Sequence, residues 1–215
     1  MATTAVIISI GILVVSFLFG YILFYISFPL SKKLKKKQLE ELTSLLINFV
    51  IYVWVGKIVT NFATFIQDPL SILAYPSNSM AFYIAIILIL VNIIYKIKRH
   101  SLNANILLNT FIPVFFFSSF VYEFIQIILE KNDFGLPYLS LLFLFVLLIV
   151  TTERFRREKS LHILFIGWSL GQVLLSFVLP YVTIFGYIIH PIFHWIVLFI
   201  LLLSYYFQNI RKVTS

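Results

Sequence analysis

The chain contains no cysteine among its 215 residues, and charged residues make up only 11% of it. The absence of cysteine excludes disulfide bonds, thiol catalysis and thiolate metal sites. Soluble domains average about 25% charged residues, so this chain has too little charge to cover a surface that faces water. Hydrophobic residues reach 61% instead. Together, these features predict a protein that is embedded in a membrane.

Long apolar runs recur along the whole chain. Each is close to the roughly 20 residues that a helix needs to cross a hydrocarbon core of about 30 Å. The first run has no basic residue before it and no small-residue cleavage pattern after it, so we interpret it as a retained helix rather than a signal peptide. We expect an all-α polytopic membrane protein, a single domain over residues 1–215 with seven transmembrane helices. The expected spans are residues 5–28, 42–66, 80–95, 106–129, 136–152, 161–179 and 182–207.

The basic residues gather in alternate loops. All but two of the 16 lysines and arginines follow the first, third, fifth or seventh span, as in "SKKLKKK" (31–37) and "ERFRREK" (153–159). Cationic loops are retained on the cytoplasmic side of a membrane, so we expect the N-terminus outside and the C-terminus in the cytoplasm. The net charge of +8 then belongs to loops that attract anionic lipid headgroups. We expect no nucleic-acid partner.

Two charged residues lie inside the expected spans. At a rise of 1.5 Å per residue, Lys57 lies about 13 Å and Glu123 about 9 Å from the outer end of its span. A charge that faces lipid at the middle of a helix costs roughly 2.5–3.5 kcal/mol on insertion scales, so we expect both side chains to face the interior of the bundle. Their opposite signs favour an ion pair. Such a pair could fix the register of two helices, or it could line a cavity that opens to the outside.

Other polar residues at similar depth favour a cavity. Asn61 follows Lys57 by one helical turn and shares its face. Gln172 lies in the middle of its expected span. His190 and His194 are one turn apart, and we expect them on one face of the last helix.

The two histidines also suggest a haem or metal site as an alternative. Haem needs axial ligands on opposite sides of the iron, which two histidines on adjacent turns of one helix do not supply. We therefore expect no metal and no cofactor. Pro191, which lies between the histidines, removes a backbone donor and is expected to kink the helix.

Three segments suggest a family. "GYILFYISFPLSKKLKKKQLEELTSLL" combines a first span with a basic turn, "VGKIVTNFATFIQDPLSIL" ends the second span, and "GWSLGQVLLSFVL" lies in the sixth. Together they resemble the bacterial phosphatidylglycerol–prolipoprotein diacylglyceryl transferases, which also have seven spans and an external N-terminus. The resemblance implies a bacterial cytoplasmic (plasma) membrane, an anionic membrane phospholipid as partner and a role in lipoprotein biosynthesis with a lipoprotein precursor.

The chain departs from this family at its signature residues. It has "PSNSMAF" (76–82) where the family has His-Gly-Gly, and Lys57 and Gln172 stand where the family has arginines. A lysine lacks the bidentate fork that suits a phosphate. We therefore expect an outward-facing polar cavity for lipid or a partner helix, without catalysis.

Two alternatives remain open. If the chain does transfer diacylglyceryl from phosphatidylglycerol to a lipobox cysteine, the reaction needs a cation at the leaving phosphate and a base for the thiol. Lys57 is then the candidate for the first role, and Glu123 or His190 is the candidate for the second. Alternatively, the chain is a small transporter in which these three residues relay protons. The remaining substrate-binding candidates are Asn61, Gln172 and His194.

Overall fold

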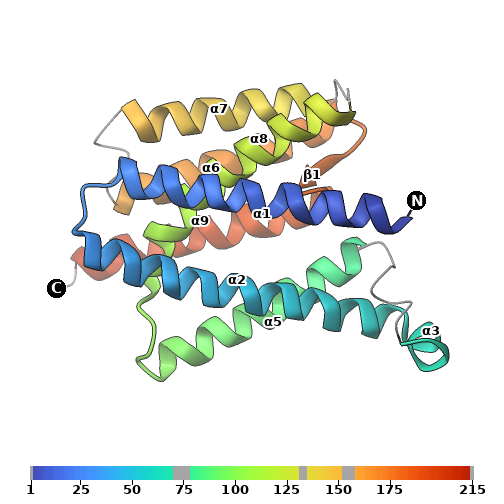
Figure 1. Ribbon diagram of the computed structural model, residues 1–215. Coiled ribbons are helices and arrows are strands. Elements are labelled where there is room, and N and C mark those ends of the chain that lie inside the picture. Colours follow the sequence, from blue (N-terminus) through green and yellow to red (C-terminus); the bar gives the residue numbers. More distant parts are fainter. Residues whose placement is uncertain (1, 70–77, 131–134, 152–157, 214–215) are drawn as a thin grey trace. The chain divides into compact units, whose positions relative to one another are not determined.

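The computed structural model describes residues 2–69, 78–130, 135–151 and 158–213. These residues are almost entirely helical, which confirms the all-α class, and they include one short β-hairpin (Figure 1). They form two compact units. The first unit contains Met1–Val15 and Pro29–Phe111, and the second contains Ser16–Phe28 and Ile112–Ser215.

Two long helices, α1 (Ala2–Ser27) and α6 (Ala104–Glu130), contribute to both units. The first unit also contains α2 (Lys32–Thr60), α3 (Phe62–Gln67) and α5 (Ser79–Lys98). The second unit also contains α7 (Leu136–Thr151), α8 (Glu158–Val178), β1 (Val182–Ile184), β2 (Tyr187–Ile189) and α9 (Pro191–Val213).

Five helices are long and apolar enough to cross a membrane, namely α1, α2, α5, α6 and α8. The helices α7 and α9 have shorter apolar segments, Leu136–Thr151 and Pro191–Tyr206. At 1.5 Å per residue, the 16 residues of α7 reach about 24 Å, which is less than a hydrocarbon core of about 30 Å. The chain is therefore a membrane protein by the length and composition of five helices, and the total of seven spans stays a prediction.

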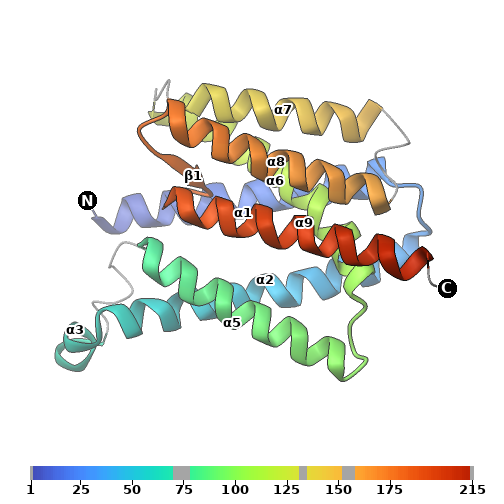
Figure 2. The same ribbon diagram turned by 180° about the vertical axis from the view of Figure 1, so that it is seen from behind.

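In the first unit, α2 and α5 lie side by side (Figures 1 and 2) because a glycine lets their backbones approach. A Cβ on Gly56 would lie 2.6 Å from the carbonyl oxygen of Ala81 and 2.8 Å from its Cα. Ala81 and Ala85, one turn apart on α5, are fully buried. Small residues at one face are what permit close packing of membrane helices.

The second unit uses the same device between α1 and α6. A Cβ on Gly20 would collide with the Ser118 hydroxyl and would lie 3.1 Å from the carbonyl oxygen of Val114. Ser16, one turn before Gly20, is fully buried as well. The Ser-x-x-x-Gly spacing therefore forms the contact face of α1 in this unit.

The second expected span, 42–66, is wrong at both ends. The helix α2 begins at Lys32, where the Ser31 hydroxyl accepts a hydrogen bond from the Leu34 N–H at 3.4 Å. It ends at Thr60, because Asn61 leaves the helical conformation with φ −127° and ψ 42°. Helix α3 follows as a separate short turn. The lysines between 32 and 37 are therefore helical, and all of them except Lys35 are exposed.

The last expected span, 182–207, is wrong in its first third. Residues Val182–Ile184 and Tyr187–Ile189 pair as antiparallel strands instead. Phe185 and Gly186 form the turn and both have positive φ, 49° and 80°. Two consecutive residues with positive φ make the two-residue type I′ turn that matches the twist of a hairpin. The β-branched and aromatic residues of this segment favour strands, and Phe185-Gly186 favours a turn. These preferences decide the local structure, although the apolar character of the segment predicted a helix.

Pro191 begins α9 rather than kinking it, so the expected kink is wrong. Proline suits the first position of a helix, because its missing N–H would have no helical partner there. The residue before a proline is disfavoured in the helical conformation, which ends the hairpin segment at His190. The last helix is thus set back by nine residues from its expected start.

We predict opposite effects from two glycine-to-alanine changes. Gly56→Ala should lower the melting temperature in detergent, because overpacking against a backbone atom costs about 1–3 kcal/mol. Gly11→Ala should leave it unchanged or raise it slightly, because no atom lies within 4 Å of its new Cβ and alanine favours a helix by about 1 kcal/mol. Equal effects of the two changes would contradict the close contact of α2 with α5.

Candidate functional site

The residues expected to form the site are divided between the two units. Lys57 and Asn61 belong to the first unit, and Glu123, Gln172, His190 and His194 belong to the second. Because Lys57 and Glu123 belong to different units, the ion pair between them stays a prediction.

Lys57 lies in the last turn of α2 and is only 7% exposed. It follows Gly56, the residue at the close contact with α5. Asn61 has a clear structural role beside it. Its side-chain Nδ2 donates to the carbonyl oxygen of Lys57 at 3.1 Å and to Thr60 Oγ1 at 3.0 Å. Asn61 thus caps the end of α2. This role explains why a polar residue lies here, and no ligand is needed to explain it.

Glu123 lies in α6 of the second unit and is 5% exposed. The Thr183 hydroxyl, on β1, donates to Glu123 Oε1 at 3.5 Å. Tyr138, at the start of α7, is also buried, and Glu123 lies within electrostatic range of its hydroxyl. The carboxylate therefore lies between a strand and a helix that are both distant from it in sequence.

Tyr138 connects this carboxylate to α8. The Trp168 indole Nε1 donates to the Tyr138 hydroxyl at 3.4 Å, and the side chain of Gln172, one turn along α8, is a hydrogen-bonding neighbour of the same hydroxyl. On α9, the ring of His194 meets Trp168 edge to face at 6.4 Å between centroids. Its carbonyl oxygen accepts from the Ser169 hydroxyl at 3.2 Å. We name Glu123, Tyr138, Trp168, Gln172 and His194 the buried polar cluster.

Two side chains of this cluster have unused hydrogen-bonding capacity. Gln172 and His194 are both 0% exposed. Within the part of the chain that the structure describes, neither ring nitrogen of His194 has a hydrogen-bond partner, and the Gln172 amide lies beside the Tyr138 hydroxyl without a hydrogen bond of standard distance and angle. A buried polar group without a partner costs about 1–3 kcal/mol, and such groups are few in native proteins. An amide and an imidazole can each donate and accept hydrogen bonds, so both kinds of polar group are present in the cluster.

His190 and His194 do not share a helix face, so that expectation is wrong. His190 precedes α9 and is exposed, and its Nδ1 accepts a hydrogen bond from the Ile192 N–H at 3.3 Å. It therefore caps the first turn of α9. His194 lies inside the helix and is completely enclosed. The proline between them causes the difference, because it begins the helix.

Two members of the cluster and one residue beside it were not predicted from the sequence. They are Tyr138, Trp168 and Thr183, which lie in apolar segments without any local sequence motif. Only tertiary contacts, Trp168 with Tyr138 and Thr183 with Glu123, bring them to the cluster. One signal was present, since Trp168 and Gln172 have the spacing of one helical turn.

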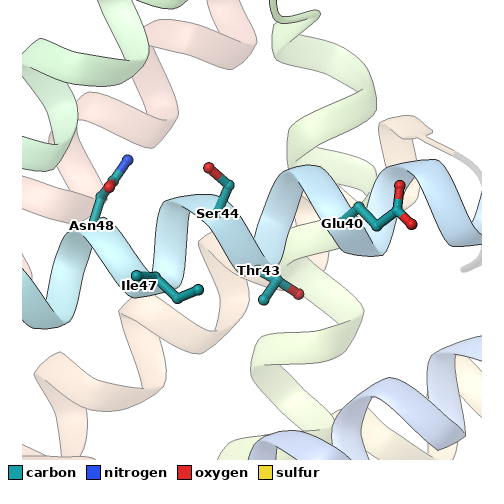
Figure 3. A pocket seen from close by; sticks show the side chains of 5 residues that line it. All are labelled: Glu40, Thr43, Ser44, Ile47 and Asn48. Atoms are coloured by element: carbon teal, nitrogen blue, oxygen red, sulfur yellow. The ribbon is translucent and has the colours of Figure 1, made fainter.

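A second polar feature lies on α2 in the first unit. An open hollow runs over one side of this helix and is lined by Glu40, Thr43, Ser44, Ile47 and Asn48. Figure 3 shows the side chains of Glu40, Ser44 and Asn48 pointing to the same side, one turn apart from one another. Glu40 also lies 3.9 Å from the Lys36 ammonium in an exposed ion pair. The hollow is open to the surroundings, and one of its lining residues, Glu40, is already engaged in an ion pair. We therefore place the candidate site in the buried polar cluster.

Among the described residues, no three histidines, aspartates or glutamates lie close enough together to hold a metal ion. Comparisons of the chain with protein-family models, with curated proteins and with solved structures give no match. The resemblance to the diacylglyceryl transferases therefore rests on the sequence segments alone.

We predict that Gln172→Met raises the melting temperature of the purified protein. The change removes an amide that makes no hydrogen bond of standard geometry and keeps the length of the side chain, so the gain should be about 1 kcal/mol. Gln126→Met is the matched control in the same unit, because the Gln126 Nε2 donates to the Tyr122 hydroxyl at 3.0 Å. It should lose about 1 kcal/mol. A loss of stability in Gln172→Met like that of the control would show that its amide is satisfied.

Proposed function

We propose that this protein is a seven-span membrane protein of the diacylglyceryl-transferase type that binds the polar headgroup of a membrane lipid and does not catalyse transfer. One observation carries the proposal: the side chains of Gln172 and His194 are fully enclosed, and among the described residues neither makes a hydrogen bond of standard geometry, although the Gln172 amide lies beside the Tyr138 hydroxyl. Polar groups inside membrane segments are costly and are commonly kept for a function. A headgroup would supply the missing partners.

The surroundings of the cluster suit a lipid. Aromatic rings of Phe115, Phe165 and Trp168 pack against one another beside it, with centroids 4.9 to 5.7 Å apart. Such a wall accommodates apolar parts of a ligand while the amide and imidazole bind its oxygens. Lipid is also the ligand that already surrounds apolar helices. Lys57, which belongs to the first unit, is a separate candidate for binding a phosphate and is not part of this cluster.

Binding is better supported than catalysis. Transfer of diacylglyceryl to a thiol needs preorganised positive charge at the leaving phosphate and a base for the thiol. Gln172 supplies an uncharged amide where the family has an arginine. The exposed His190 uses its Nδ1 to cap α9, which makes it a weaker candidate for the base or for a proton relay. A lipoprotein precursor as second substrate belongs to the catalytic alternative.

We predict that lipid retention depends on the cluster. Purified, delipidated protein is incubated with phosphatidylglycerol, and bound phosphorus per protein is measured after washing. Gln172→Met and His194→Phe should each weaken retention about tenfold, which corresponds to the loss of one good hydrogen bond at about 1.4 kcal/mol. Gln126→Met should retain lipid like the wild type.

Two results would overturn the proposal. Retention that is unchanged in both cluster variants would show that the cluster does not hold the headgroup. Full restoration of lipoprotein lipidation by this chain, in cells depleted of their own diacylglyceryl transferase, would establish the catalytic alternative instead.

The proposed topology places the N-terminus outside and the C-terminus in the cytoplasm. Because the chain has no cysteine, single cysteines can report it without background. In intact cells, Tyr181→Cys should react with a membrane-impermeant thiol reagent, whereas Lys37→Cys and His100→Cys should react only after lysis. A single reversed position would contradict the seven-span arrangement.

A further inference from the structure

The β1–β2 hairpin is an irregular segment that reaches into the second unit. The ring of Phe185, at its turn, stacks on Phe17 of α1 at 5.1 Å between centroids and meets Phe115 of α6 at 5.8 Å. Phe17 and Phe115 both lie near the middle of their helices. The turn is therefore inserted among the helices and does not simply bridge their ends. Non-helical backbone at membrane depth is tolerated only where protein buries it or where it lines a cavity.

The hairpin also covers one side of the buried polar cluster. Strand β1 lies against α8, the helix that carries Trp168 and Gln172. The hydroxyl of Thr183 donates to Glu123 at 3.5 Å, a long hydrogen bond. At the turn, Gly186 approaches Tyr122 so closely that a Cβ would lie 2.5 Å from the tyrosine hydroxyl. The hairpin therefore contacts α6 at two consecutive residues, Tyr122 and Glu123.

The pairing of the two strands is too short to hold the hairpin alone, so its contacts with the helices are needed as well. It has three residues in each strand, and an isolated two-stranded hairpin is marginal at best in water. Phe185 has φ 49°, a conformation that is unfavourable for a bulky residue. Such strain persists only where the surroundings impose it, and it is common at ligand clamps and switches. Leaving this position would release the strain.

We propose that the β1–β2 hairpin is a displaceable plug that closes the buried polar cluster at the end of the second unit where α8 connects to α9. In the closed state, Thr183 binds Glu123 and Phe185 fills the space between α1 and α6. When the hairpin withdraws, solvent and polar groups reach the cluster from that end. The inference deepens the proposed function, because the plug would control access to the same headgroup site.

The experiment measures access to a cysteine behind the plug. Ser119→Cys is the reporter, because Ser119 is 2% exposed and lies within electrostatic range of the Tyr138 hydroxyl. Ile149→Cys is the control. It is equally buried and lies on α7 three turns beyond Tyr138. The probe is N-ethylmaleimide, and the rate of its reaction with each single cysteine is measured in detergent micelles without added lipid.

Each cysteine is then combined with Phe185→Ala, which removes the stacking on Phe17 and Phe115, or with Thr183→Val, which removes the hydrogen bond to Glu123. Phe185→Ala should speed the labelling of the Ser119→Cys reporter about tenfold, because the lost ring contacts raise the population of the open state. Thr183→Val should speed it by a smaller factor. The labelling of the Ile149→Cys control should not change.

Unchanged labelling of the reporter in Phe185→Ala would overturn the plug. Faster labelling of reporter and control together would also overturn it, because it would indicate general loosening of the helices. The readout uses no lipid, so a protein that fails to retain phosphatidylglycerol can still show a moving plug. Conversely, if the hairpin does not move, the plug is wrong, and the lipid-retention measurement still tests the proposed function.

Discussion

In a hydrocarbon layer, every polar group of the protein must find its partner within the protein. This constraint accounts for the local structure of the chain. Ser31 and Asn61 cap the two ends of α2. Hydroxyl groups inside the apolar helices bond back to carbonyl oxygens one turn earlier, as Thr43 does to Leu39 at 2.7 Å and Thr151 does to Leu147 at 2.7 Å. Against this background, Gln172 and His194 are costly exceptions, as are the hydroxyl groups of Ser118 and Ser119 on α6.

Small residues allow the helices to pack closely. Gly56 on α2 and Gly20 on α1 bring their helices close to α5 and α6 within their respective units. Close packing excludes lipid and water from the interior, so a polar side chain left there has only neighbouring side chains as partners. The same packing raises the electrostatic strength of those interactions. The buried polar cluster is therefore expensive to keep, which is the reason for our proposal that it binds a polar group.

The helices were largely predictable because apolar length and flanking charge decide them. The interruption at Asn61 and the hairpin at 182–189 were not, since an apolar run such as "VTIFGYII" fits a buried helix and a buried strand equally well. The Phe-Gly turn and Pro191 contained the missing signal. Within the candidate cluster, Glu123 and Gln172 were predicted from the sequence because a polar residue inside an apolar span is conspicuous. Tyr138 and Thr183 were missed because only tertiary packing brings them to the carboxylate.

The central claim is that the cluster keeps unsatisfied polar groups in order to bind a ligand. A density map of the protein in lipid nanodiscs, with a bound antibody fragment to aid alignment, tests it most directly. We predict non-protein density within hydrogen-bond distance of the Gln172 amide and the His194 imidazole. A map in which these two side chains are enclosed by protein alone, with no such density, would contradict the account.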